Sequence, residues 1–168
     1  GLLWRRSRQG AAGVTAAAHS NSDGLPPHPD IVRNPGHPLI QDLDALPFPA
    51  RDLLDNRLYR SPETGNPLTV IHGNRGCPAK CIFCPAGVMS GFQMRYRTPQ
   101  SIMAEIEECV TRFGLREFLF HGDTFTINKR WLLEICNGIV ERNLKVHWGC
   151  NSRVDTIDAM SGTPTLDA

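Results

Sequence analysis

Three cysteines stand within one eight-residue run of the chain, Cys77-Pro-Ala-Lys-Cys81-Ile-Phe-Cys84. Thiolates are soft ligands, and three of them can hold three irons of a [4Fe–4S] cluster while the fourth iron stays open for another molecule. A second interpretation is a structural zinc site with Cys150 or His72 as the fourth ligand. Structural zinc cysteines usually come in two separated pairs, so the single triplet favours the cluster.

The remaining cysteines and two histidines look structural. Cys109 and Cys136 lie inside apolar helical patterns, and we expect both to be buried packing residues. His72 and His121 stand near the ends of predicted strands, where we expect partly buried packing residues rather than an acid or a base. Nothing marks the chain as secreted, and a tight thiol cluster is typical of a reducing compartment, so we expect a cytoplasmic protein.

Composition excludes several classes of partner. The 168 residues include 18 Lys plus Arg and 17 Asp plus Glu, which gives a net charge of +1. This balance supplies no electrostatic footprint for nucleic acid or for an anionic membrane. The apolar runs are far shorter than the ~18 residues that span a bilayer. We therefore expect neither a nucleic-acid nor a membrane partner.

Apolar periodicity alternates between strand and helix in the second half of the chain. Strands are predicted at 68–72, 117–121 and 145–150, with helices at 99–113 and 129–142 between them. The short connections make the three strands parallel neighbours. Three strands are too few to close a barrel, since a complete (β/α)₈ barrel takes ~250 residues. The predicted fold class is therefore α/β, a partial (β/α) barrel.

The ends of the chain lack this regularity. Residues 1–66 are rich in proline and are predicted to be an irregular linker and N-terminal extension, with a flexible insertion at 7–30. Residues 67–158 form the predicted barrel part, and 159–168 an irregular tail. Inside the barrel part, the basic, aromatic stretch 93–97 is expected to be a solvated loop, and the alternative is a segment that closes over a bound cofactor.

The cysteine run resembles the signature of the radical S-adenosylmethionine (radical SAM) superfamily, in which an aromatic residue, here Phe83, precedes the third cysteine. Three further segments, 42–51, 122–126 and 151–155, resemble the linker and two strand-end motifs of the cobalamin-dependent branch. One departure is Gly122, which stands where that branch usually has an aspartate.

The resemblance implies a mechanism and a set of site residues. Cys77, Cys81 and Cys84 would bind a [4Fe–4S] cluster, the amino and carboxylate groups of SAM would chelate the open iron, and Phe83 would lie near the adenine. Reductive cleavage of SAM would then give methionine and a 5′-deoxyadenosyl radical, which abstracts hydrogen from the substrate. No catalytic residue is assigned beyond the cluster ligands.

Asp123 and Arg153 are the other expected contacts of the cofactor. Each follows a predicted parallel strand, so both should lie at the carboxyl edge of the sheet with the cysteine loop. A carboxylate can pair with the ammonium of SAM and a guanidinium with its carboxylate. The alternatives are a helix-capping or turn residue for Asp123 and, for Arg153, a structural salt bridge with Asp155 or Asp158.

The resemblance also implies partners. These are a small-molecule substrate and an electron donor such as a flavodoxin or ferredoxin, and cobalamin is left as an option for the full-length parent. The reaction would start radical chemistry on an unactivated carbon, such as methyl transfer or oxidative cyclisation. We expect the chain to be a fragment, weakly active or inactive alone. The alternative from another class is a non-catalytic zinc-binding or iron–sulfur module.

Overall fold

The computed structural model describes residues 3–5, 31–33 and 38–156, and the chain divides into two units, Gly1–Leu39 and Ile40–Ala168. In the first unit, β1 (Leu3–Arg5) pairs antiparallel with β2 (Ile31–Arg33), two short strands that the sequence did not predict. The insertion predicted at 7–30 and the tail predicted at 159–168 lie outside the described residues.

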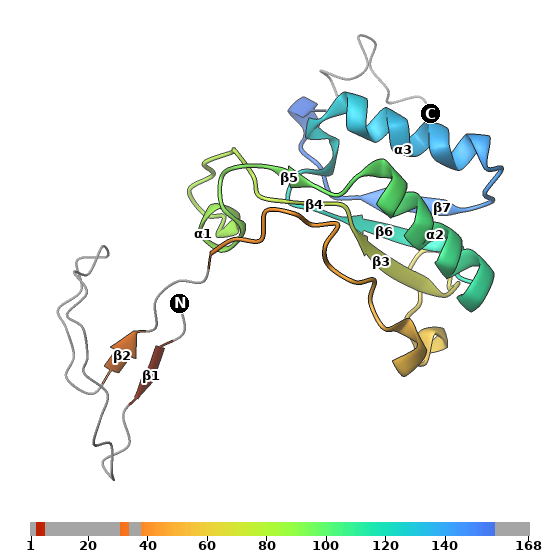
Figure 1. Ribbon diagram of the computed structural model, residues 1–168, viewed down its shortest axis with the longest axis horizontal. Helices are drawn as coiled ribbons and strands as arrows, with labels where there is room; N and C mark the ends of the chain where they lie inside the picture. Colours follow the sequence, from red (N-terminus) through yellow and green to blue (C-terminus); the bar gives the residue numbers. More distant parts are fainter. Residues whose placement is uncertain (1–2, 6–30, 34–37, 157–168) are drawn as a thin grey trace. The chain divides into compact units, whose positions relative to one another are not determined.

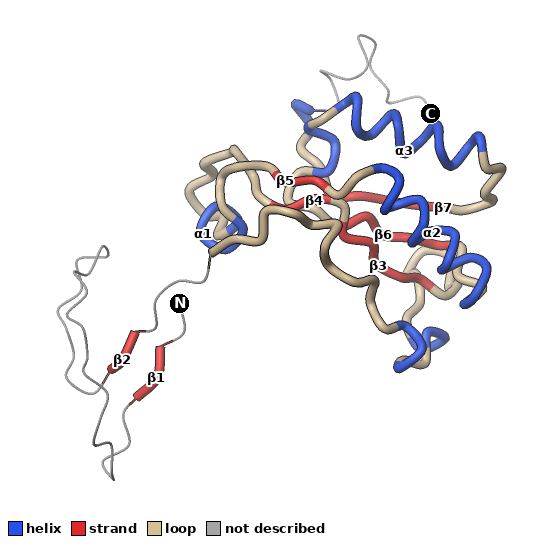
Figure 2. Tube along the Cα trace, in the orientation of Figure 1, coloured by secondary structure: helices blue, strands red, loops and turns tan. Residues whose placement is uncertain are grey.

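A three-stranded parallel sheet forms the centre of the second unit. Its strands are β3 (Leu68–His72), β6 (Glu117–His121) and β7 (His147–Cys150), in the order β3-β6-β7. Helix α2 (Pro99–Phe113) connects the first two strands and α3 (Lys129–Glu141) the last two. Both helices lie on one side of the sheet (Figures 1 and 2). The α/β fold of a partial β/α barrel is thereby confirmed.

Local capping signals set the helix ends where the sequence predicts them. The Thr98 side chain accepts a hydrogen bond from the Ser101 N–H at 3.2 Å, and Gly114 ends α2 in the left-handed conformation at φ 67°. Asn128 accepts from the Trp131 N–H at 3.1 Å at the start of α3. No helix within the described ranges is both long and apolar enough to cross a membrane.

The core lies between the two helices and the sheet. Alternation along the strands turns Ile71 and Phe120 toward the helices, and Cys109 is fully buried among them, as predicted. Burial raises the pKa of the Cys109 thiol to about 11, so this group stays protonated at neutral pH. Cys136 packs at the edge of the same core and is only partly buried.

The opposite face of the sheet has no helix over it in the part of the chain described here (Figure 1). Val70, His72 and His121 lie on this face and are exposed. In a closed β/α barrel, this side of the sheet faces the interior.

Several short elements surround the sheet and were not predicted. The cysteine loop leaves the sheet through β4 (Asn74–Arg75) and returns through β5 (Arg95–Tyr96), which pair antiparallel. Arg95 and Arg97, expected in a solvated loop, are each only 8% exposed, so that prediction was wrong. The short elements are η1 (Arg51–Leu53), η2 (Asn56–Leu58), β4 (Asn74–Arg75), α1 (Ala86–Ser90), β5 (Arg95–Tyr96) and η3 (Phe125–Ile127).

A buried carboxylate explains why the two arginines leave the solvent. Glu105 of α2 is 1% exposed and pairs with the guanidinium groups of Arg51, at 2.6 Å, and Arg97. Arg51 also donates to the Val70 carbonyl at 2.9 Å, and Arg97 to the His72 carbonyl at 3.1 Å. The network therefore joins the proline-rich linker, helix α2 and the carboxyl end of β3.

We predict that Glu105→Gln lowers the free energy of unfolding by about 3–5 kcal/mol, because it leaves two buried guanidinium groups without a full counter-charge. Glu108→Gln is the control, since its pair with Arg112 at 2.9 Å is exposed and should contribute only about 0.5 kcal/mol. Urea denaturation followed by circular dichroism measures both. Equal losses in the two variants would contradict the assigned role of the network.

Candidate functional site

The cysteine loop is attached to its surroundings near its first cysteine. The Gly76 N–H donates to Asp123 Oδ2 at 2.8 Å, and the Cys77 N–H donates to the Gly91 carbonyl at 3.1 Å. The Cys77 sulfur lies 3.3 Å from Thr124 Oγ1. Since Asp123 and Thr124 follow β6, the loop after one strand is held by the loop after the next.

The three thiols differ in exposure. Cys77 is buried, Cys81 is partly buried and Cys84 is exposed, and all three are free. The Cys84 N–H donates to the Cys81 carbonyl at 3.1 Å, which forms a tight turn between the last two cysteines. Within that turn, Ile82 and Phe83 are largely exposed, and no described contact fixes the Phe83 ring. The loop therefore presents two thiols and an aromatic ring to solvent.

The structure places Asp123 and Arg153 at this loop. Asp123 accepts from Gly76, so it braces the cysteine loop as a turn residue would. Arg153 forms an ion pair with Asp155 at 2.8 Å, which is one of the two expected structural alternatives, and this pair raises the pKa of the guanidinium. Its Nη1 also lies 3.4 Å from the Cys81 sulfur. Asp158 lies outside the described residues.

The departure at Gly122 has a packing reason. A Cβ atom at this position would lie 1.6 Å from Asn74 Oδ1. Asn74 is 2% exposed, and its Nδ2 donates to the Thr124 carbonyl at 3.3 Å. Its Oδ1 is buried and has no hydrogen-bond partner among the described residues. The sequence analysis did not identify Asn74 as a residue of the site. Its position, three residues before Cys77, is the only signal in the sequence that could have pointed to it.

The donors of this loop fit an iron–sulfur cluster better than zinc. Zinc requires four donors around one ion, and the loop itself supplies three. In a cubic cluster, each thiolate binds a different iron, so the sulfurs need not meet at one point. Cys150, a suggested fourth zinc ligand, packs against the core, and burial raises the pKa of its thiol.

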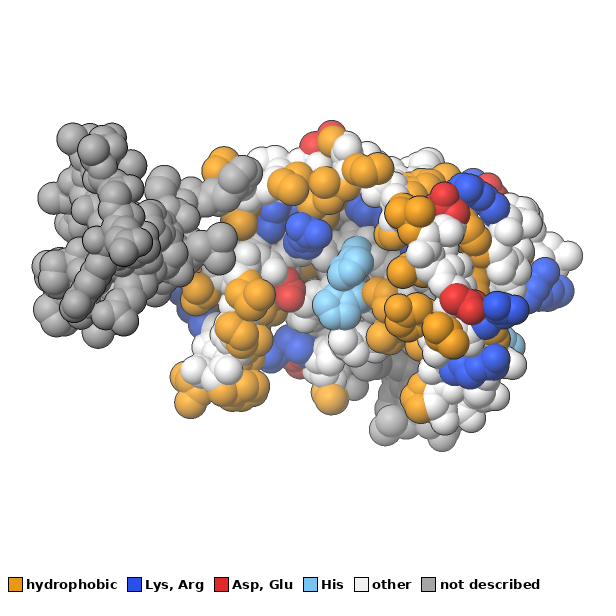
Figure 3. Space-filling view, turned by 90° about the horizontal axis from the view of Figure 1, so that it is seen from below, with side chains coloured by type: hydrophobic (Ala, Val, Ile, Leu, Met, Phe, Trp, Pro, Cys, Tyr) orange, Lys and Arg blue, Asp and Glu red, His pale blue; other side chains and the backbone are white. Residues whose placement is uncertain are grey.

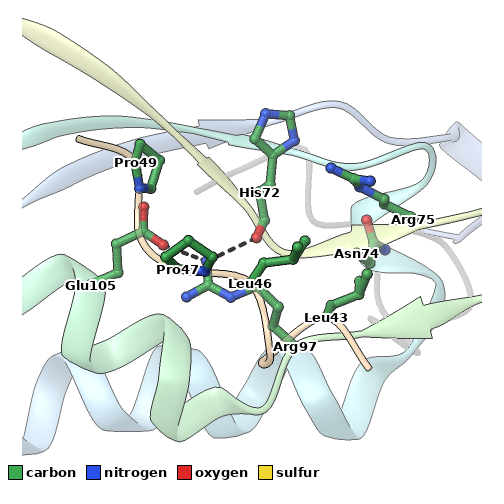
Figure 4. A pocket seen from close by; sticks show the side chains of 9 residues that line it. All are labelled: Leu43, Leu46, Pro47, Pro49, His72, Asn74, Arg75, Arg97 and Glu105. Atoms are coloured by element: carbon green, nitrogen blue, oxygen red, sulfur yellow. Dashed lines mark hydrogen bonds and ion pairs between the residues drawn. The ribbon is translucent and has the colours of Figure 1, made fainter. Parts of the chain in front are cut away.

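A cleft lies next to the loop, at the carboxyl end of β3 (Figure 4). Apolar linker residues, among them Leu43 and Leu46, form part of its lining. His72, Asn74 and Arg75 line it as well. Polar groups and an apolar wall thus meet close to the cysteine loop.

The sequence profile of the radical SAM superfamily matches residues 71–164, more than half of the chain and all three cysteines of the loop. The chain belongs to the radical SAM superfamily. It is 35% identical to an uncharacterized methyltransferase of Pyrococcus horikoshii over 76% of this chain and 28% of that protein.

Two other relatives carry more specific names. Identity is 30% to the anaerobic magnesium-protoporphyrin IX monomethyl ester cyclase of Rubrivivax gelatinosus, over 86% of this radical SAM chain and 25% of the cyclase. The chain is also 28% identical to the cytidylyl-2-hydroxyethylphosphonate methyltransferase of Streptomyces wedmorensis, over 75% of this chain and 25% of that methyltransferase. The chain thus spans about a quarter of the length of the curated relatives it matches.

We predict that Gly122→Ala destabilises the protein by about 1–3 kcal/mol, because the added methyl group overlaps Asn74 Oδ1. Gly149→Ala is the matched control, since a Cβ there meets nothing within 4 Å. Thermal unfolding of the single variants and of Gly122→Ala combined with Asn74→Ala measures the coupling. If the two losses simply add in the double variant, the proposed clash does not exist.

Proposed function

We propose that this chain is the cluster-binding part of a radical SAM enzyme, with Cys77, Cys81 and Cys84 as the three iron ligands. The observation that carries the proposal is the group of three free thiols on one braced loop at the carboxyl edge of a parallel sheet. Active sites of β/α folds lie at this edge. When bound, the cluster supplies one electron to SAM, whose carbon–sulfur bond breaks to give methionine and a 5′-deoxyadenosyl radical.

The protein's own residues bind and orient the cofactor. The Asp123 carboxylate, next to the loop, suits the ammonium group of SAM, and it keeps the loop in place through Gly76. The planar guanidinium of Arg153, beside Cys81, suits the carboxylate of SAM. Binding SAM there requires Arg153 to share its guanidinium between Asp155 and the cofactor. The exposed Phe83 ring offers a stacking surface for the adenine.

We assign the parent enzyme to methyl transfer or oxidative cyclisation on an unactivated carbon of a small molecule. The names of the relatives, two methyltransferases and a cyclase, support these two reaction types. The electron donor in this proposal is a flavodoxin or ferredoxin. The resemblance of the linker at 42–51 to that of the cobalamin branch supports cobalamin as a cofactor of the parent. Free thiols suit a reducing compartment, so we propose the cytoplasm.

We predict that alanine at Cys77, Cys81 or Cys84 abolishes assembly of the cluster after anaerobic reconstitution, because each thiolate is the sole protein ligand of one iron. Cys109→Ala is the control and should keep the cluster, at a cost of about 1 kcal/mol in packing. Iron and sulfide analysis with visible absorption measures the outcome.

Loss of the cluster in Cys109→Ala, with retention in a variant of the triplet, would show that the ligand assignment is wrong. Stoichiometric zinc without sulfide in the unaltered chain would instead favour a non-catalytic zinc-binding module.

A further inference from the structure

Arg75 differs from every other arginine between residues 38 and 156. Its side chain makes no hydrogen bond or ion pair with a described residue, and it is exposed. The others all have such a partner, a carboxylate or a backbone carbonyl: Arg51, Arg57, Arg60, Arg95, Arg97, Arg112, Arg116, Arg130, Arg142 and Arg153. An unpaired guanidinium next to the candidate site is therefore a distinguishing feature of this protein.

Two imidazoles accompany this guanidinium. His72 and His121 end neighbouring strands in register, and their ring centroids lie 4.9 Å apart at an interplanar angle of 65°. The Arg75 side chain extends toward the His72 ring (Figure 4). Figure 3 shows histidine side chains gathered at the surface of the molecule. Two imidazoles and one guanidinium thus lie next to one another at the carboxyl edge of the sheet.

The local charge balance is positive. Partial desolvation of the ring lowers the pKa of His72, and repulsion from the neighbouring His121 and Arg75 lowers it further. Glu105 acts in the other direction, but its carboxylate is already shared by two guanidinium groups. Asp123 accepts the Gly76 N–H within the cysteine loop. No described carboxylate is paired with the three basic groups, so the position suits an anion from outside the chain.

We propose that Arg75, His72 and His121 form a binding site for an oxyanion, a carboxylate, phosphate or phosphonate group. A guanidinium can hold two oxygens of such a group with parallel hydrogen bonds, and a neutral imidazole donates one more. The site adjoins the cysteine loop, so any role that it has in the reaction rests on the proposed function. Its occupant is then either the carboxylate of SAM or an anionic group of the substrate.

Substitution of Arg75 should leave the fold intact, because its exposed side chain loses no contact within residues 38–156. Position 75 pairs with Arg95 only through the backbone of β4 and β5. Arg75→Gln is therefore a clean variant, and His72→Gln and His121→Gln are its companions. Arg130→Gln is the control, since Arg130 is exposed and its guanidinium is already paired with Glu134 of the same helix.

The first experiment titrates the full chain, without cluster, with inorganic phosphate at constant ionic strength. Histidine and arginine side-chain NMR signals report binding. We expect saturable shifts at His72, His121 and Arg75, and a phosphate affinity about tenfold weaker in Arg75→Gln, because a charge-assisted hydrogen-bond pair is lost. Absence of a saturable shift, or equal weakening in Arg130→Gln, overturns the proposal.

The second experiment measures the affinity for SAM of the cluster-loaded chain by calorimetry. Weaker SAM binding in Arg75→Gln, with unchanged iron content, supports the site and identifies the carboxylate of SAM as its occupant. If Arg75→Gln binds SAM as tightly as the unaltered chain but has lost phosphate binding, the site is supported and its occupant is an anionic group of the substrate. Failure of the unaltered chain to take up a cluster would overturn the proposed function, while the phosphate titration still decides the anion site.

Discussion

The carboxylate of Glu105, buried between two guanidinium groups, is the interaction on which the rest of the structure depends. Removing one carboxylate and two arginines from water is costly, and the cost is offset only when their hydrogen bonds are satisfied. Besides Glu105, Arg51 donates to the Val70 carbonyl and Arg97 to the His72 carbonyl, in the last part of β3, and within this network only Arg51 Nη1 has no partner among the described residues. The network thereby fixes the linker, helix α2 and the point at which the chain leaves the sheet toward the cysteines.

From that point, the site is assembled by contacts between the loops after adjacent strands. Asp123 accepts the Gly76 N–H, so the loop after β6 holds the loop that carries the thiols. The close approach of Asn74 permits only glycine at position 122 without a shift of its neighbours. Arg153, after β7, reaches the sulfur of Cys81. Parallel strand order therefore gathers residues that are far apart in the sequence at one edge of the sheet.

Features governed by local signals could be predicted from the sequence. The strands at 68–72 and 117–121, both helix caps and the burial of Cys109 follow from apolar periodicity and capping chemistry. The pairing of Arg97 with Glu105 could not be predicted, because a basic stretch looks the same whether it is solvated or paired with a carboxylate from another element. Strand β7 starts at His147, later than predicted, because its partner β6 starts opposite it at Glu117. That Arg75 has no partner among the described residues likewise could not be predicted, because contacts between side chains of different elements leave no local pattern in the sequence.

The central claim is that three sulfurs hold a cubic cluster with one iron open to SAM. Mössbauer spectroscopy of the chain, reconstituted anaerobically with ⁵⁷Fe, tests it most directly. The account predicts four irons per chain, one of them distinct from the other three and altered when SAM is added. A spectrum that does not respond to SAM, or a fourth protein ligand on the distinct iron, would contradict it.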